Sequence, residues 1–274
     1  MKDSSPIKKH ENRADTVLIA ASGRSGQTWL GFMLAHLLNA RFIEPYCLAR
    51  GIVFTGHRYV LELTQGSLPG RLPTPYQLVV KTHEHPDPYF SLSRKVLLIV
   101  RDPRDAITSA SVRYHVMKTT GSDIEEDAQE MALVTERLPK QITLKDRIWS
   151  LIYGNRTLAI WMSARKWRNF HVAWRRLPFV HIVRYEDLLQ RPLEAMQAIC
   201  SYLAIPDDEH AIEETLRALS FKEITGRSAG SEKAESIMFR KAIVGDHKKK
   251  LSTFELALIR MFCKEEATRL GYTI

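Results

Sequence analysis

The residues best suited to binding an anion lie in the loop Ser22–Thr28, which reads SGRSGQT. Two glycines, hydroxyl side chains and Arg24 occur together there, and a guanidinium binds phosphate through a charged fork. The apolar run Val17–Ala21 before the loop predicts a strand buried on both faces. The apolar stretch Trp29–Leu38 after it predicts a buried helix, whose first N–H groups and dipole would point at one spot. The stretch therefore predicts an anion cradle.

Two other interpretations of the loop remain open at this point. An ordinary strand-to-helix turn also uses glycine for backbone freedom. A nucleotide P-loop has the pattern G-x-x-x-x-G-K-[ST]. The glycines here are closer together than in that pattern, and no Lys-Ser/Thr pair follows Gly26.

Polar residues also follow two further predicted strands. The strand Gln77–Thr82 runs into His83-Glu84-His85, and the strand Lys95–Val100 ends at Arg101–Asp105, before a stretch that looks helical from Ala106. Because ligands bind beyond the carboxyl ends of parallel strands, we expect these polar residues to gather at one site.

The rest of the chain continues the alternation of strands and helices. A fourth strand is expected at Phe179–Arg184, leading into Tyr185-Glu186-Asp187-Leu188 and a helix to Leu203. Another helix is expected from Asp207 to near Leu219, and an amphipathic helix at Ser252–Gly271. This order predicts an α/β fold with a central parallel sheet flanked by helices and joined by right-handed crossovers. We expect one domain over residues 16–274, after a flexible N-terminal arm at residues 1–15.

Composition and charge limit the classes of function. No apolar run approaches the ~20 residues needed to span a bilayer, and the polar start lacks the apolar core of a secretion signal, so a cytoplasmic protein without a membrane segment is expected. Cys47, Cys200 and Cys263 are odd in number and far apart, which favours neither a disulfide framework nor a metal site. The net charge of +9 suits a polyanionic partner, either nucleic acid, an acidic membrane surface or a phosphorylated cofactor.

Two of these stretches together resemble the cofactor signatures of the sulfotransferases that use 3′-phosphoadenosine 5′-phosphosulfate (PAPS). GRSGQTWL at Gly23–Leu30 is similar to their phosphosulfate loop PKSGTTWL, and RDPRDAITS at Arg101–Ser109 to their 3′-phosphate motif R-[ND]-P-[KR]-D-x-x-x-S. The resemblance continues in the family's order through four more segments: KTH at Lys81–His83, HIVRYEDLLQRP at His181–Pro192, SFKE at Ser220–Glu223, and FRKAIVGDHKKKL at Phe239–Leu251.

The resemblance implies a P-loop-like phosphosulfate-binding loop, PAPS as sulfuryl donor, adenosine 3′,5′-bisphosphate as product, and no metal. It implies that Arg101 and Ser109 hold the 3′-phosphate. The full set of cofactor-binding residues that it implies is Arg24, Ser25, Gly26, Gln27, Thr28, Trp29, Arg101, Ser109, Tyr185, Ser220, Phe221, Arg240 and Lys241.

Sulfuryl transfer to a hydroxyl or amine needs a base and stabilisation of the leaving phosphate. His83 is the expected general base because an unperturbed imidazole has a pKa near ~6.5, and Lys81 and Arg24 are expected to stabilise the departing charge. A structural His83 that ends the strand is the alternative. His85 is the rival base, although a surface turn before Pro86 suits it better.

Four residues depart from the family pattern. Arg24 stands where Lys is usual, Gln27 where Thr is usual, Ala242 where Gly is usual, and His247 where Trp is usual. For Glu186 and Asp187, in the segment YEDL, helix capping after a strand is favoured over a catalytic role.

The acceptor is expected to be a small molecule bound between the stretches 40–75 and 118–145, which are long for connections in a compact domain. Sugar, phenol, steroid, lipid and specialised metabolite all remain open as acceptors, and so does homodimer formation. Two competing functions are a P-loop-type nucleotide kinase, which would need Mg²⁺ and stop in EDTA, and a basic nucleic-acid-binding domain. No recognition motif supports the latter, so no nucleic-acid partner is expected.

Overall fold

The computed structural model describes residues 15–43, 74–86, 93–110, 155–226, 228–230 and 242–274. Residues 103–110 are helical. The other elements in chain order are β1 (Thr16–Ala21), α1 (Gln27–Leu38), β2 (Arg41–Ile43), β3 (Leu78–Thr82), β4 (Lys95–Val100), α7 (Arg156–Arg175), β5 (Val180–Arg184), α8 (Tyr185–Gln190), α9 (Pro192–Leu203), α10 (Glu209–Ala218), α11 (Phe221–Thr225), a short 3-10 helix (Asp246–Lys249) and α12 (Thr253–Arg269).

The strands form one parallel sheet in the order β2-β3-β1-β4-β5. β1 lies at the centre, with Ile19 opposite both Lys81 of β3 and Leu97 of β4. The expected α/β fold with a central parallel sheet is confirmed. The carboxyl ends of β3, β1, β4 and β5 are neighbours, so the segments that follow these strands are brought to one edge.

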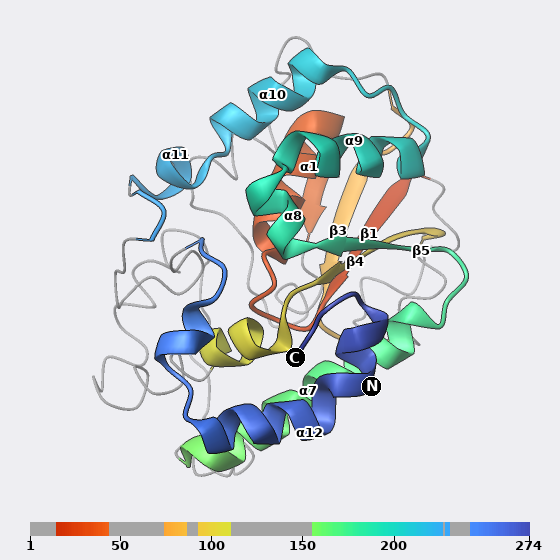
Figure 1. Ribbon diagram of the computed structural model, residues 1–274. Helices are drawn as coiled ribbons and strands as arrows, with labels where there is room; N and C mark the ends of the chain where they lie inside the picture. The colour runs from red at the N-terminus through yellow and green to blue at the C-terminus, as the bar shows by residue number, and fades with distance from the viewer. Residues whose placement is uncertain (1–14, 44–73, 87–92, 111–154, 227, 231–241) are drawn as a thin grey trace, which may run out of the picture.

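Helices cover both faces of the sheet, as Figure 1 shows. Val17, Ile19 and alternate residues of the other strands pack against α1, α8, α9 and α10. Leu18, Ala20 and their neighbours pack on the opposite face against α7, α12 and the helix at residues 103–110. Because successive side chains of a strand point to opposite faces, both layers bury apolar surface, and this explains why β1 and β4 read as unbroken apolar runs.

Two details differ from the sequence expectations. β2 was not expected, because its three residues are too short to show a pattern; Phe42 is held there by an edge-on contact with the ring of Phe32. The helix expected to run from the YEDL segment to Leu203 is two helices, α8 and α9. Arg191 between them has φ −140° and ψ 59° because a residue before proline avoids the helical region.

Three expectations fall largely outside the described residues. They are the N-terminal arm at 1–15, most of the stretch 40–75 and the whole of 118–145. The extent of the single domain therefore stays a prediction. Among the described residues, no helix is long and apolar enough to cross a membrane.

Candidate active site

The loop after β1 forms an open cradle at the start of α1. Gly23, Arg24 and Gly26 have positive φ values of 55°, 61° and 83°, so three residues in four adopt the left-handed conformation that favours glycine. Gly26 is also required for space, because a Cβ atom there would lie 2.5 Å from Cδ2 of Tyr185. No side chain caps α1 and no acidic residue occupies its first turn. Its N-terminal N–H groups and dipole therefore favour an anion.

Arg24 joins this loop to the second predicted signature. Its Nε donates to Oγ of Ser109 at 3.2 Å, and its carbonyl oxygen accepts from Nη1 of Arg101 at 3.0 Å. Three of the residues expected to bind phosphate groups thus lie in direct contact, although 85 positions separate Arg24 from Ser109.

Arg101 is fixed on several sides at the end of β4. Besides the carbonyl of Arg24, the carbonyl of Ile243 accepts from its Nη2 at 3.1 Å. Its guanidinium carbon lies 4.4 Å from the ring centroid of Tyr185, within the range of a cation–π contact. Within the part of the chain that the structure describes, its Nε is buried and has no hydrogen-bond partner. A buried donor of this kind is costly unless a ligand satisfies it.

The segment 242–247 is tied to the same strand end by Asp105. The carboxylate accepts from the backbone N–H of Gly245 at 2.6 Å, from the backbone N–H of His247 at 3.0 Å, and from Nδ1 of His247 at 2.7 Å. Burial by itself raises the pKa of Asp105, but these hydrogen bonds and the charge of Arg101 outweigh it and lower the pKa. Asp105 is therefore a carboxylate, and His247, which replaces the usual Trp, is explained by its bonds to it.

His83 lies beyond the end of β3, between β1 and the start of α1. Its Nδ1 lies 2.8 Å from the carbonyl oxygen of Ala21. Because a carbonyl only accepts, Nδ1 carries the hydrogen, and in the neutral ring Nε2 is the basic nitrogen. Nε2 lies 3.5 Å from Nε2 of Gln27, whose amide oxygen accepts from the N–H of Ser25 at 3.1 Å. Gln27, a departure from the family pattern, thus links the loop to His83.

Lys81 and Trp29 complete the edge. The buried ammonium of Lys81 donates to Oγ1 of Thr28 at 3.2 Å, so a positive charge lies against the first turn of α1. Nε1 of Trp29 donates to the carbonyl of Leu219 at 2.7 Å. That bond brings the segment with Ser220 and Phe221 beside α1, and Ser220 itself caps α11 by accepting from the N–H of Glu223.

A family model described as sulfotransferase domain matches residues 14–271 of this chain. The chain belongs to the sulfotransferase domain family. This sulfotransferase is 24% identical over 257 residues to sulfotransferase 6B1 of Danio rerio, covering 90% of this chain and 76% of that protein. It is 24% identical over 267 residues to sulfotransferase 1B1 of Mus musculus, covering 88% and 79%.

Solved structures of the same fold are similar to this sulfotransferase along almost its whole length. Mouse sulfotransferase SULT7A1 complexed with PAP superposes with a TM-score of 0.57 at 16% identity, covering 97% of this chain and 90% of the other. Retinol dehydratase in a complex with retinol and PAP gives a TM-score of 0.52 at 17% identity, covering 98% and 85%. These similarities establish the fold. Family membership makes the chain a sulfotransferase and not a nucleotide kinase.

Most of the expected site residues of this sulfotransferase lie together at the carboxyl ends of the strands, and two lie outside the described residues. Arg240 and Lys241, expected at the 3′-phosphate, lie outside the described residues, as does Cys47. Ala242, just after them, has a positive φ of 50°, which explains why glycine suits this position. His85 is exposed and packs beside the ring of Phe170.

One expectation about the YEDL segment is wrong. Neither Glu186 nor Asp187 caps α8, because Arg184 occupies the cap position and no side-chain capping bond is made. Asp187 pairs with Arg191 one turn later, whereas Glu186 accepts from the backbone N–H of Asp102 and from the hydroxyl of Tyr272. The sequence also gave no sign of the Asp105 contacts, since Gly245 is 140 positions away.

Proposed function

We propose that this sulfotransferase moves the sulfuryl group of PAPS to a hydroxyl or amine of a small-molecule acceptor, with His83 as the general base. One observation carries the proposal. The Nδ1–H of His83 is held by the carbonyl of Ala21, so the basic Nε2 is directed to the side where Gln27 begins α1. A base must lie within hydrogen-bond reach of the proton that it removes, and this ring cannot turn away without losing its bond to Ala21.

The charged groups of the site fit a nucleotide that carries two separate phosphate positions. The α1 N-terminus with Lys81 forms one positive region, and Arg101 with Ser109 forms another, joined by the side chain of Arg24. The unpartnered buried Nε of Arg101, in the described part of the chain, supports a ligand on that side. We propose that the first region holds the 5′-phosphosulfate and the second, with Arg240 and Lys241, the 3′-phosphate.

Bound PAPS would supply the sulfuryl group for an in-line displacement. His83 would take the acceptor proton at Nε2 while its Nδ1–H stays on Ala21, so that the ring keeps its orientation when it becomes charged. Lys81 and Arg24 would stabilise negative charge on the phosphate side, where fixed cations cost no reorganisation during the reaction. Sulfuryl transfer of this kind needs only the positioning of the two substrates and the stabilisation of charge, and no redox group takes part.

The acceptor class is proposed from the relatives. One relative is named 3-alpha-hydroxysteroid sulfotransferase, from Cavia porcellus, 24% identical over 196 residues, and retinol dehydratase was solved with retinol. Both names refer to apolar small molecules that bear a hydroxyl. Hydroxysteroids and retinoid alcohols therefore come first in an acceptor panel, followed by phenols, sugars and amines.

The test is to incubate the purified protein with PAPS and each acceptor, and to measure adenosine 3′,5′-bisphosphate by chromatography. We expect its release to depend on both substrates and to continue in EDTA. Release that stops in EDTA would contradict the proposed reaction. A protein that binds adenosine 3′,5′-bisphosphate tightly but releases none with any acceptor in the panel would contradict the proposed acceptor class.

A further inference from the structure

The last residues of the chain return to the site edge of the sheet. After α12, the carbonyl of Thr273 accepts from Nη2 of Arg104 at 2.9 Å, and the carbonyl of Gly271 accepts from Nη1 of Arg184 at 3.3 Å. Figure 1 shows the C-terminus beside the helix that follows β4. The C-terminal segment is thus bound to residues next to the ends of both β4 and β5.

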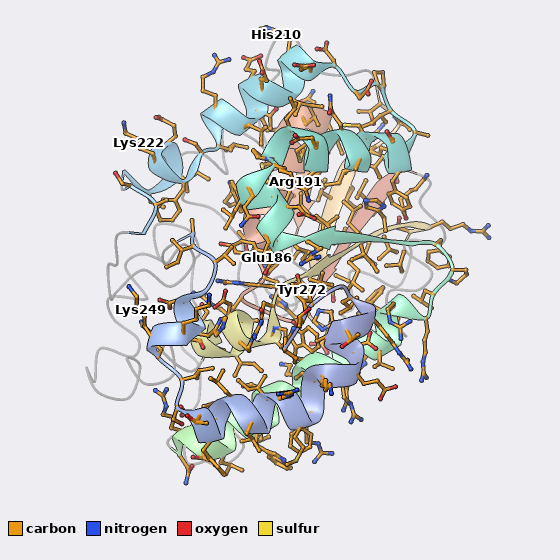
Figure 2. The ribbon with its side chains drawn as sticks, in the orientation of Figure 1. Glu186, Arg191, His210, Lys222, Lys249 and Tyr272 are labelled. Atoms are coloured by element: carbon orange, nitrogen blue, oxygen red, sulfur yellow. The ribbon has the colours of Figure 1, made fainter. Side chains whose placement is uncertain are left out.

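Tyr272 is the centre of this attachment. Its side chain is 5% exposed, the guanidinium of Arg184 covers its ring at 4.4 Å, and its hydroxyl donates to Oε2 of Glu186 at 2.7 Å. Burial and the neighbouring carboxylate of Glu186 raise the pKa of Tyr272. The phenol therefore keeps its proton at neutral pH and remains a hydrogen-bond donor. Figure 2 shows Tyr272 and Glu186 labelled next to each other below α8.

Glu186 connects Tyr272 to the end of β4, where Arg101 lies. Its second oxygen, Oε1, accepts from the backbone N–H of Asp102 at 3.0 Å, which is the peptide directly after Arg101. The side chain of Asp102 is in turn held by Arg104 through contacts of 2.6 to 3.2 Å. The residue before Glu186 is Tyr185, whose ring lies under the guanidinium of Arg101. Fixing Glu186 therefore constrains Arg101 both through its own peptide and through the ring beneath it.

We propose that Tyr272 and Glu186 are positioning residues that hold Arg101 in the orientation needed for the 3′-phosphate, which makes the C-terminal segment part of the cofactor site. This inference rests on the proposed function, since it assigns the 3′-phosphate to Arg101. We propose no direct contact of either residue with the nucleotide. A buried carboxylate with both oxygens engaged holds its partners firmly, because each lost bond leaves a buried polar group unsatisfied.

The test is the preference for a nucleotide with a 3′-phosphate. Calorimetry on the full chain gives Kd for adenosine 3′,5′-bisphosphate and for adenosine 5′-monophosphate, and the Kd for the monophosphate divided by the Kd for the bisphosphate reports the 3′-phosphate contacts alone. Tyr272→Phe deletes only the hydroxyl. We expect it to lower the ratio about fivefold, the size of one lost hydrogen bond, while Kd for the monophosphate stays the same. Glu186→Gln keeps an acceptor for Asp102 and should lower the ratio less than Glu186→Ala.

Tyr202→Phe is the matched control. The hydroxyl of Tyr202 accepts from the N–H of Val96 at 2.8 Å and donates to the carbonyl of Phe179 at 2.6 Å, at the opposite end of β4. It should lower the melting temperature and leave the ratio unchanged. A Tyr272→Phe protein with the wild-type ratio, or an equal fall in both tyrosine variants, would overturn the inference and spare the proposed function. A wild-type protein with no preference for the bisphosphate would overturn both.

Discussion

Replacing Asp105 by asparagine should loosen the segment 242–247 and weaken cofactor binding. The carboxylate is 1% exposed and receives three hydrogen bonds. An asparagine oxygen can keep the two bonds from His247, but its NH₂ group then faces the N–H of Gly245, a donor against a donor. A charge-assisted bond is lost, a buried donor is left unsatisfied and the remaining bonds weaken, so we expect unfolding free energy to fall by about 3 kcal/mol.

The affinity of Asp105→Asn for the cofactor should also be lower than that of the wild type. The carbonyl of Ile243 accepts from Arg101, so a loosened segment leaves that guanidinium less constrained. A coupling of about 1.4 kcal/mol would raise Kd for adenosine 3′,5′-bisphosphate about tenfold. Urea denaturation and calorimetry measure the two quantities. Asp187→Asn is the control, because its ion pair with Arg191 is exposed, with side-chain accessibilities of 33% and 64%, and such pairs contribute about 0.5 kcal/mol or less.

The pH dependence gives a second check on the same side chain. The folded-state pKa of Asp105 is lowered, so its contribution is complete above its ordinary pKa of about 3.9 and is lost as pH falls through the folded value. The stability difference between wild type and Asp105→Asn should therefore narrow only at acidic pH, as the pH falls below about 4. An Asp105→Asn protein that is as stable as Asp187→Asn and binds the bisphosphate like wild type would refute the reasoning.

Four other outcomes are expected. Arg101→Ala should weaken binding of adenosine 3′,5′-bisphosphate at least about tenfold by calorimetry; unchanged binding would remove Arg101 from the 3′-phosphate site. Arg24→Lys keeps the charge but not the fork, so turnover should stay within about threefold of wild type, whereas Arg24→Ala should lose at least about tenfold; equal activities would exclude a role for this charge. Burial lowers the pKa of His171 to about 4, so stability should fall by up to about 3 kcal/mol as pH drops from 6.5 to 4, and a slope retained in His171→Gln would place its source elsewhere. Replacing residues within 118–145 should change acceptor KM more than cofactor Kd, and the reverse pattern would show that the acceptor binds elsewhere.

The sequence predicted the centre of the sheet because β1 and β4 are buried on both faces. β1 and β4 are unbroken apolar runs that end abruptly in polar loops, and that pattern depends only on neighbouring residues. β2 contributes three residues and no such run, so its place in the sheet is decided by tertiary pairing with β3. The division between α8 and α9 was available from Pro192, since the residue before a proline resists the helical conformation.

Site residues were predictable where a motif names them, and the contacts between motifs were not. Arg24, His83 and Arg101 each follow a strand, so their convergence followed from the parallel order. The bonds of Asp105 to Gly245 and of Glu186 to Tyr272 join positions 140 and 86 residues apart. A lone carboxylate after a strand has the same local pattern whether it caps a helix or holds a distant segment, which is why Glu186 was misread as a cap.

The most direct test of the central claim is the turnover of His83→Ala beside His85→Ala, with calorimetry on both proteins. His83 is bound to Ala21 at the cradle, whereas His85 is exposed two residues later. With PAPS and an accepted hydroxyl compound, His83→Ala should lose ~10²–10⁴ in kcat, remain folded, and bind adenosine 3′,5′-bisphosphate within about twofold of wild type, since no cofactor contact is removed. His85→Ala should turn over like wild type. A His83→Ala protein that is destabilised yet active, or a loss of kcat confined to His85→Ala, would contradict the assignment of His83 as the base.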